Sequence, residues 1–260
     1  MTSRVVITGA ASGIGAATVA SLRARGAQVV GLDVNASSGE VLACDVRDQA
    51  SVDRAVAEAV ERLGGLDVLI NCAGVGDPQS AGQPPGEDAL RVLDVNLLGP
   101  WRVTAAALPA LRDSRGRVVN VASGLAHLTV PFATAYCMSK RGLVAYSDAL
   151  RLEHGDAITV TTVYPGYIRT PIHEAAAAKG LSLEGAVPAE SLEDAARTLT
   201  RAALDGPKRD LATTRLGEIS YALLRVLPRG LVDFVVVRQF KRGGFEDSEL
   251  AGDKRARTGD

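Results

Sequence analysis

Apolar and polar residues alternate along much of the chain in a pattern that predicts short buried strands separated by amphipathic helices. The expected strands are the apolar runs Val5–Ile7, Gln28–Val34, Val41–Val46, Asp67–Asn71, Arg117–Val121 and Ile158–Val163. The expected helices are Ile14–Arg25, Gln49–Leu63, Ala89–Arg112 and Ala135–His154. Gly26 follows the first helix and Gly64 the second, and glycine is a good helix C-cap.

Strands this apolar, spaced by helices, indicate a parallel sheet that is buried on both faces. Because crossovers between parallel strands are right-handed, the sheet is expected to be doubly wound. No internal repeat or low-complexity linker interrupts the pattern. We therefore predict an α/β fold with a doubly wound parallel sheet (Rossmann-like) over residues 1–215. A helical extension of the same domain over residues 216–245 and a polar, disordered tail over 246–260 are expected to follow.

The last part of the chain has a different pattern. Arg209–Thr214 has the composition of a short final strand, and Ile219–Val237 is strongly apolar. The residues that break the apolar stretch are Arg225, Pro228, Arg229, Gly230 and Asp233. These breaks argue against a membrane span and favour two short amphipathic helices joined at Pro228–Gly230. The helices either pack on the domain or on a partner subunit, or they form the wall or mouth of an apolar pocket that touches a membrane. We favour packing and do not expect membrane contact.

The 260 residues are 47% hydrophobic and 23% charged, which is ordinary for a globular protein with an ample core. The formal net charge of −1 argues against a nucleic-acid partner bound by bulk electrostatics. The first residues, 1–9, are too short a stretch and too soon broken by glycine to form a signal peptide. The widely spaced Cys44, Cys72 and Cys137 form no CxxC pair. We therefore expect free thiols in a reducing cytoplasm, with neither a disulfide framework nor a metal site.

A glycine-rich stretch, TGAASGIG at residues 8–15, follows the first expected strand and opens the first expected helix. Gly9, Gly13 and Gly15 allow a tight turn and a close approach of the backbone to a pyrophosphate, and the helix N-terminus favours negative charge. The spacing is GxxxGxG rather than the commoner GxGxxG. Such a turn can be purely structural, but its place between a strand and a helix predicts nucleotide binding.

Asp33 ends the second expected strand, 20 residues after Gly13. A carboxylate at this position can accept hydrogen bonds from an adenosine ribose 2′-OH and repels a 2′-phosphate. No Arg or Lys occurs between Gly9 and Gly15 or directly after Asp33 to pair with that phosphate, so we favour NAD over NADP. Asp45 either meets the adenine edge or caps the following helix, and its spacing does not decide between these roles.

Tyr136 and Lys140 are four residues apart near the start of an expected helix, so they share one face of it. A neighbouring ammonium favours the phenolate and lowers the pKa of the phenol. Moving that pKa from about 10 to about 7 requires about 4 kcal/mol of differential stabilisation. The two residues are therefore a candidate general acid/base, although a Tyr and a Lys at this spacing are more often both solvated.

Other polar residues fall at the ends of expected strands or inside an expected helix. Small residues in NCAG at 71–74 would let a flat ligand lie against the backbone after a strand. Asn96 lies within the stretch Ala89–Arg112, where an Asn usually faces solvent or hydrogen-bonds locally. Ser123 places a hydroxyl at the carboxyl end of another strand, 13 residues before Tyr136.

Taken together, TGAASGIG, NCAG, Asn96, Ser123, Tyr136-x-x-x-Lys140 and Pro165-Gly166 resemble the short-chain dehydrogenase/reductase family. They come in that family's order and spacing, over roughly residues 3–205. Cys72 is a small departure, because the family usually has Asn there, but its neighbours match and we expect little consequence. The resemblance implies an NAD(P)-dependent short-chain alcohol dehydrogenase or ketoreductase with a Tyr-x-x-x-Lys site.

The resemblance also implies roles for individual residues. Tyr136 would donate or accept the proton at the substrate oxygen, and Lys140 would lower its pKa and bond the nicotinamide ribose. Ser123 would hold and polarise the substrate carbonyl or alcohol, and Asn96 would support a water that links Lys140 to solvent. The pyrophosphate and its sugars would be bordered by Gly9, Ser12, Gly13, Ile14 and Gly15. Adenine would be bordered by Asp45 and Val46, and its ribose by Asn71, Ala73 and Gly74. The nicotinamide would be fixed by Pro165, Gly166, Ile168 and Thr170, with Thr170 near the carboxamide.

A substrate pocket is expected beside Ser123. The residues expected to border it are His127, Leu128, Val130, Pro131 and Phe132, with Tyr164, Tyr167 and His173 flanking the Pro165-Gly166 turn. Residues 171–190, which include Lys179 and Glu184, are expected to form a mobile lid. The apolar rim and the C-terminal extension resemble family members that act on bulky hydrophobic alcohols and ketones, including steroid-like and lipid-like compounds.

We therefore predict an NAD-dependent oxidoreductase that transfers a hydride between a hydrophobic secondary alcohol or ketone and the nicotinamide. The alternatives are an NADPH-dependent ketoreductase and a non-catalytic nucleotide-binding regulator. The regulator would not need Asn96, Ser123, Tyr136 and Lys140 together. Family habit suggests a homodimer or homotetramer formed through the helices at 89–112 and 135–154.

Overall fold

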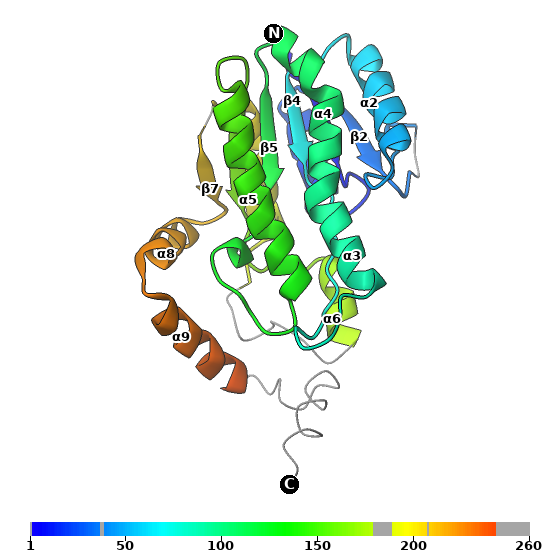
Figure 1. Ribbon diagram of the computed structural model, residues 1–260. Coiled ribbons are helices and arrows are strands. Elements are labelled where there is room, and N and C mark those ends of the chain that lie inside the picture. Colours follow the sequence, from blue (N-terminus) through cyan, green and yellow to red (C-terminus); the bar gives the residue numbers. More distant parts are fainter. Residues whose placement is uncertain (1, 37–38, 179–188, 207, 243–260) are drawn as a thin grey trace.

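A seven-stranded parallel sheet forms the centre of the part of the chain that the computed structural model describes, residues 2–36, 39–178, 189–206 and 208–242 (Figure 1). The strand order is β3-β2-β1-β4-β5-β6-β7. The strands are β1 (Arg4–Thr8), β2 (Gln28–Asp33), β3 (Val41–Ala43), β4 (Val68–Asn71), β5 (Arg117–Val121), β6 (Thr159–Tyr164) and β7 (Asp210–Ala212). This is the doubly wound fold that the sequence predicts, and the prediction is confirmed.

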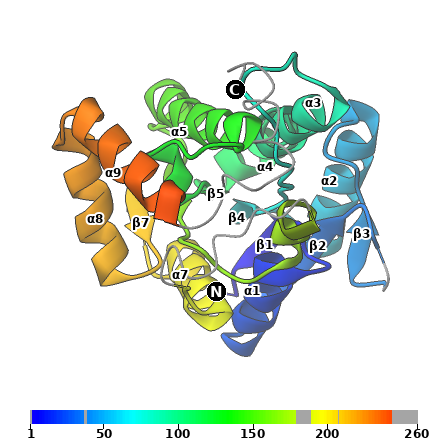
Figure 2. The ribbon, with the colours of Figure 1, turned by 90° about the horizontal axis from the view of Figure 1, so that it is seen from below.

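Helices cover both faces of the sheet (Figure 2). One face carries α1 (Gly13–Ala24) and α7 (Leu192–Leu204), and the other carries α2 (Gln49–Leu63), α4 (Gly99–Asp113) and α5 (Thr134–His154). Because side chains alternate along a strand, Val5 and Ile7 of β1 pack toward α1 and α7, whereas Val6 packs toward α2 and α4. The sheet is therefore apolar on both sides, as its continuous hydrophobic runs predict.

The remaining helices lie at the ends of the sheet. They are α3 (Glu87–Leu93), α6 (Glu174–Ala178), α8 (Arg215–Val226) and α9 (Arg229–Arg242), with 3-10 turns at Gly124–Ala126 and Pro171–His173. Helices α8 and α9 lie beyond β7, at one edge of the sheet (Figure 1). The prediction of two helices joined near Pro228 is confirmed. Within the described ranges no helix has the length and apolarity needed to cross a bilayer.

The long helix expected over Ala89–Arg112 is interrupted. A π-helical turn, Asp94–Leu98, separates α3 from α4. Pro100 has no backbone N–H, so it cannot donate the usual hydrogen bond to the carbonyl of Asn96. Gly99 follows this turn and lets Val46 approach, since a Cβ on Gly99 would lie 2.9 Å from Val46 Cγ2. The expectation of one continuous helix was therefore wrong at its centre.

Three further expectations need comment. Strand β3 ends at Ala43 rather than Val46, because the chain must turn toward Asp48, whose side chain caps α2 by accepting from the Ala50 N–H. Helix α7 was not expected, although Ser191 caps it by accepting from the Asp194 N–H at 2.9 Å. Half of the expected lid over 171–190, namely residues 179–188 with Lys179 and Glu184, lies outside the described residues, as does the expected tail over 246–260. The boundary between residues 215 and 216 stays a prediction.

Candidate functional site

A cleft of about 1280 Å³ opens along the carboxyl ends of the strands, where a doubly wound sheet binds its ligands. It crosses the point between β1 and β4 where the strand order reverses. Pockets for one small molecule typically enclose about 300–1,000 Å³, so this cleft has room for a dinucleotide and a second small molecule.

The glycine-rich turn after β1 forms one wall of the cleft. Gly9 and Gly13 have φ angles of 72° and 52°, in the left-handed region that favours glycine. A Cβ on Gly15 would lie 1.9 Å from the Gly9 carbonyl oxygen, so a larger residue cannot fit there. Ser12 is the N-cap of α1, and its side chain makes no capping hydrogen bond. The turn therefore brings free N–H groups of a helix N-terminus to the cleft, which fits a pyrophosphate.

Asp33 lies in the cleft at the end of β2. One oxygen of its carboxylate accepts from the Ala11 N–H at 3.0 Å, and the other accepts from the Asn35 N–H at 2.9 Å. These bonds fix the direction of the carboxylate and tie it to the glycine-rich turn. The arrangement fits an acceptor for two ribose hydroxyl groups.

Asp45 and Val46 also line the cleft, and the structure excludes one of the two roles left open for Asp45, that of capping the next helix. The cap of α2 is Asp48, not Asp45. The Asp45 carboxylate forms a two-bond ion pair with Arg47, with an Nη2–Oδ2 distance of 2.7 Å and an Nε–Oδ1 distance of 3.0 Å. Hydrogen bonding by the Arg47 side chain lowers the pKa of Asp45. Arg47 lines the cleft as well, and nothing in the sequence motifs had indicated it.

The segment after β4 is divided between the cleft and the core. Ala73 and Gly74 line the cleft, as expected. Asn71 does not, because its amide is buried between the sheet and α4, where it donates to Asn120 Oδ1 at 2.8 Å and Thr104 Oγ1 at 3.0 Å. The hydrogen bonds of the Asn71 side chain indicate a structural role, and the expectation that this residue borders a ribose stays a prediction. Burial raises the pKa of the adjacent Cys72 thiol to about 12, so this thiol stays neutral.

Asn96 is fully buried behind the cleft and does not line it. Its Oδ1 accepts from the Val75 N–H at 2.8 Å, and its Nδ2 donates to the Val75 carbonyl at 2.9 Å. It thereby holds the segment that runs past Gly74 in an extended form. A Cβ on Gly74 would lie 3.4 Å from Asn96 Oδ1 and 3.6 Å from Lys140 Nζ, so these groups are neighbours. The structure supports a positioning role for Asn96, and its expected part in a water chain stays a prediction.

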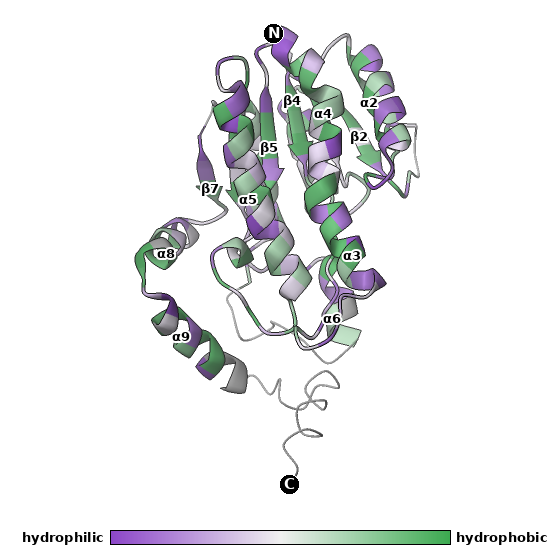
Figure 3. Ribbon diagram, in the orientation of Figure 1, coloured by the Kyte–Doolittle hydropathy of each residue, from purple (hydrophilic) through white to green (hydrophobic). Residues whose placement is uncertain are grey.

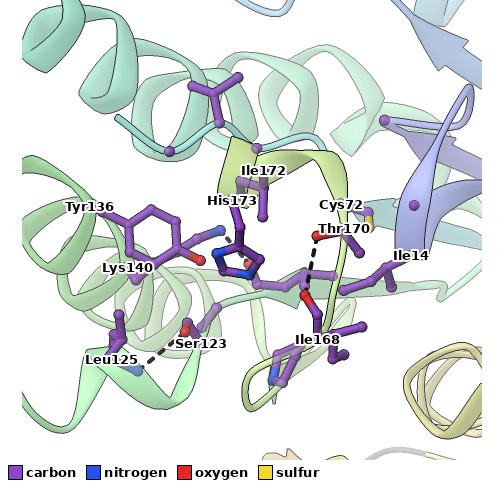
Figure 4. A pocket seen from close by; sticks show the side chains of 18 of the residues that line it. Ile14, Cys72, Ser123, Leu125, Tyr136, Lys140, Ile168, Thr170, Ile172 and His173 are labelled. Atoms are coloured by element: carbon purple, nitrogen blue, oxygen red, sulfur yellow. Dashed lines mark hydrogen bonds between the residues drawn. The ribbon is translucent and has the colours of Figure 1, made fainter. Parts of the chain in front are cut away.

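Ser123, Tyr136 and Lys140 come together on one wall of the cleft (Figure 4). Ser123 follows β5, and its Oγ accepts from the Leu125 N–H at 3.2 Å. Tyr136 and Lys140 project from the first turns of α5, and Lys140 Nζ donates to the Val121 carbonyl at 2.9 Å. Helix α5 thus places a phenol beside the hydroxyl of Ser123 and an ammonium behind both.

The acidities of this group differ from the sequence-based expectation. Burial raises the pKa of the Tyr136 phenol to about 12, and a hydrogen bond with Ser123 offsets part of the rise. Burial also lowers the pKa of the Lys140 ammonium to about 8. Lys140 was expected to lower the pKa of Tyr136. In the protein alone desolvation of the phenol sets the direction of the shift, and the ammonium lies 5.7 Å from the centre of the Tyr136 ring.

The loop after β6 forms the floor between the two ends of the cleft. The lining residues from it that the sequence had indicated are Pro165, Gly166, Ile168 and Thr170. Thr170 approaches the glycine-rich turn, since a Cβ on Gly13 would lie 3.5 Å from its methyl carbon. Of the residues expected to border the substrate, Leu128, Val130, Tyr167 and His173 line the cleft. His127, Pro131, Phe132 and Tyr164 do not line it, and Tyr164 is buried and donates to Asp210 Oδ1.

Helices α8 and α9 form a wall of the cleft that the sequence left undecided. The lining residues from these helices are Leu216, Gly217, Ser220, Tyr221, Leu224 and Val236. Tyr221 packs against the backbone beside Ser123, because a Cβ on Gly124 would lie 2.4 Å from its hydroxyl oxygen. The helical spacing of residues 217, 220, 221 and 224 was the signal that could have identified this inward face.

Glu190 fastens the α8–α9 wall to the floor of the cleft, and sequence reasoning missed it. Its carboxylate accepts from the Gly166 N–H at 2.9 Å, from the Thr214 hydroxyl at 3.2 Å and from the Thr213 hydroxyl. A Cβ on Gly166 would lie 2.6 Å from this carboxylate, so a larger residue there would displace the Glu190 side chain from its hydrogen bonds. No local motif marks Glu190, because its partners come from loops far apart in the sequence.

Comparison with known proteins gives a consistent result. The chain matches the family model described as short chain dehydrogenase over residues 3–180. It is 34% identical over 186 residues to the L-fucose dehydrogenase of Bos taurus, which covers 67% of this chain and 69% of that relative.

Solved structures share the fold. A short chain dehydrogenase from Burkholderia cenocepacia in complex with NADP is 24% identical, with a TM-score of 0.76 over 89% of this chain and 96% of that one. The 3-ketoacyl-(acyl-carrier-protein) reductase from Brucella melitensis complexed with NADH is 25% identical. Its TM-score is 0.70 over 80% of this chain and 95% of that one.

Proposed function

The chain belongs to the short-chain dehydrogenase/reductase family, and we propose that it is an NAD-dependent dehydrogenase of a bulky, hydrophobic secondary alcohol. Membership of the family makes it an NAD(P)-dependent oxidoreductase of alcohols or ketones. The observation that carries the finer proposal is the convergence of Ser123, Tyr136 and Lys140 on one cleft whose opposite end holds the Asp33 carboxylate.

The residues of the chain supply position and proton transfer. A nicotinamide dinucleotide, when bound, supplies the hydride acceptor or donor. Ser123 would hydrogen-bond the substrate oxygen, and Tyr136 would take its proton during oxidation or return one during reduction. The Lys140 ammonium would stabilise the phenolate that forms when Tyr136 gives up its proton. The glycine-rich turn would hold the pyrophosphate, which leaves the reacting atoms aligned beside Tyr136.

The preference for NAD is supported by Asp33. Its fixed carboxylate would accept from ribose hydroxyls and would repel a 2′-phosphate. Arg47 lies in the same cleft, which favours a second candidate, an NADPH-dependent ketoreductase. The Nε and Nη2 groups of Arg47 already donate to the Asp45 carboxylate in the ion pair. The guanidinium therefore has fewer free donors for a phosphate than an unpaired arginine.

The nature of the substrate is suggested by the wall near Tyr136. Its apolar members are Leu125, Leu128, Val130, Leu216, Leu224 and Val236. A hydroxyl-rich sugar, such as the one named for the relative from Bos taurus, would leave its polar groups unpaired against these side chains. A bulky apolar alcohol gains from the same contact.

Reduction of NAD with a panel of secondary alcohols tests this function. The panel should run from short aliphatic alcohols to steroidal ones and include L-fucose. We expect kcat/KM to rise with the apolar surface of the alcohol. A preference for L-fucose or for short alcohols would overturn the substrate class. Turnover confined to ketones with NADPH would favour the ketoreductase instead.

Two further properties belong to the proposal. We expect a homodimer or homotetramer built on α4 and α5, whose outer surfaces carry the exposed apolar residues Trp101, Met138 and Leu152. We also expect the protein to work in the cytoplasm, where its three cysteines would stay reduced.

A further inference from the structure

The outer side of α8 is apolar and exposed. Leu216, Ile219, Leu223 and Val226 have exposed fractions of 69%, 68%, 52% and 78%. Their spacing of three, four and three residues places them in one stripe along the helix. On α9, Leu231 and Phe234 are 49% and 61% exposed. We call these six residues the C-terminal apolar face.

The inner side of the same two helices is already covered. Tyr221 and Leu224 of α8 and Val236 of α9 line the cleft, and Val232 is buried against the domain. Helix α9 is thus apolar on opposite sides, and Figure 3 shows hydrophobic colour along both helices. A helix that is apolar all round is normally covered on all sides. Packing of these helices on the domain, which the sequence favoured, therefore covers the inner apolar side of the extension and leaves the outer side exposed.

The charge of these helices indicates what kind of surface covers the C-terminal apolar face. Helices α8 and α9 contain six Lys or Arg residues and two Asp or Glu residues, a formal charge of +4, whereas the whole chain has −1. Arg215 and Arg238 are exposed at the two ends of the extension. A second copy docked through the same face would set +4 against +4, which opposes association. A negatively charged surface would be attracted.

We propose that the C-terminal apolar face docks the protein on an anionic lipid surface, as a peripheral contact. The stripe on α8 and Phe234 of α9 would enter the boundary between headgroups and acyl chains, and the arginines would meet the lipid phosphates. From the sequence alone, membrane contact was not the favoured interpretation of this stretch. The structure supplies the exposed stripe and the covered inner side that favour it.

The position of the face beside the cleft has a consequence for substrate access. Leu216 belongs to the apolar face and also lines the cleft, so the docked surface adjoins the cleft mouth. Arg229 Nη1 donates to the His127 carbonyl at 3.2 Å, which ties the start of α9 to the loop after Ser123. A hydrophobic alcohol dissolved in the lipid could then enter without crossing water. This consequence rests on the proposed function, whereas docking itself does not.

Sedimentation of the full-length protein with vesicles tests the docking. The probes are phosphatidylcholine vesicles with and without phosphatidylserine. We expect binding to the vesicles that contain phosphatidylserine, weakened by added salt. The double variant Leu223→Ser/Phe234→Ser should weaken the partition coefficient about ten-fold or more. The variant Arg238→Gln should weaken it about five-fold, the factor that corresponds to ~1 kcal/mol per basic residue at the surface.

The matched control is Leu90→Ser, which removes a 56% exposed leucine from α3 and should leave binding within about two-fold of the wild type. Dinucleotide titration identifies variants that keep their fold. If the double variant does not fold, the vesicle binding of Arg238→Gln tests the proposal instead. Equal binding to both kinds of vesicle, or to neither, would overturn the proposal. So would a double variant whose subunit count by light scattering falls while its vesicle binding is unchanged, because a second copy would then cover the face. Sedimentation needs no turnover, so failure of the alcohol panel would leave this result intact.

Discussion

The pKa values of Tyr136 and Lys140 depend on the burial of each side chain more than on the interaction between the two. The pKa of the phenol is raised to about 12 and that of the ammonium is lowered to about 8, both chiefly by desolvation. A phenol with a pKa near 12 is almost entirely protonated near neutral pH, so little phenolate is available to act as the base. Each nearby positive charge favours the phenolate and therefore has a large effect on turnover. The ammonium of Lys140 is such a charge, held in place by the Val121 carbonyl.

Replacing Lys140 by Met should shift the pH–rate profile to higher pH. Oxidation needs the deprotonated phenol, so its rate is present above the apparent pKa and is lost as pH falls through that value. Reduction needs the neutral phenol and shows the opposite dependence. Without the ammonium the apparent pKa should rise by about two units, because the phenolate loses a neighbouring positive charge. Steady-state kcat against pH measures the shift, with Lys208→Met as the exposed control. An unchanged profile in Lys140→Met would contradict this role.

Replacing Asp33 by Asn should relax the choice of cofactor. The amide keeps the size of the side chain but loses the charge that repels a 2′-phosphate. We expect the ratio of NADPH affinity to NADH affinity to rise about ten-fold, which corresponds to ~1.4 kcal/mol. Fluorescence titration of both dinucleotides measures the ratio. Tighter binding of NADPH than NADH by the wild type would refute the preference for NAD.

At the scale of elements, the Glu190 carboxylate connects the loop after β6 with the start of α8. The variant Glu190→Ala should release both segments, because the Gly166 N–H and the two threonine hydroxyls lose their shared acceptor. We expect kcat/KM to fall about ten-fold. Steady-state kinetics with the best alcohol of the panel measures the fall. The matched control is Glu193→Ala, which removes a largely exposed carboxylate three residues away. Equal kinetics in both variants would show that the contact has no part in positioning.

Much of the fold at this scale followed from local patterns. Each expected strand was found because its run is rich in apolar and β-branched residues, as in β6, whose residues are mostly Thr and Val. Helix α2 matched its expected bounds because Gly64 adopts a left-handed φ of 68° at its end. The π-helical turn at Asn96 was missed, since its cause is one absent N–H at Pro100 within an otherwise regular helical pattern. Helix α7 was missed although Ser191 and Asp194 form a recognisable capping pair.

The sequence predicted the residues of the site whose position at the end of a strand or the start of a helix places them in the cleft. It predicted less well the residues whose side-chain direction depends on partners that are distant in sequence. The glycine-rich turn, Ser123, Tyr136 and Lys140 meet as their order along the sheet implies. Asn71 carries the same motif-based expectation, yet its amide faces Asn120 in the core. Spacing along the chain cannot tell which side of a strand end faces a ligand. The raised pKa of Tyr136 in the protein alone could not be foreseen for a related reason, because burial is a property of the assembled cleft.

At the scale of the whole molecule, the family model ends at residue 180, and α8 and α9 beyond it complete one wall of the cleft. The expected subunit interface lies elsewhere, on α4 and α5. There Trp101 is 56% exposed, with its ring centroid 5.6 Å from that of Tyr146.

Replacing Trp101 by Glu should therefore dissociate the oligomer. A charge placed at the centre of an apolar interface is desolvated without a partner, which typically costs several kcal/mol. Light scattering should show a dimer or tetramer for the wild type and smaller species for the variant. The control Val226→Glu, on the outer side of α8, should leave the subunit count unchanged. A monomeric wild type, or dissociation by the control alone, would place the interface elsewhere.

The most direct test of the whole account is the pair of variants Tyr136→Phe and Tyr146→Phe. Each removes one phenol hydroxyl from α5, but only the first lies in the cleft. We predict that Tyr136→Phe lowers kcat at least about a thousand-fold while NADH binding stays within a few-fold of the wild type, and that Tyr146→Phe keeps most of its turnover. Oxidation of a true alcohol substrate by Tyr136→Phe at a rate near that of the wild type would contradict the account.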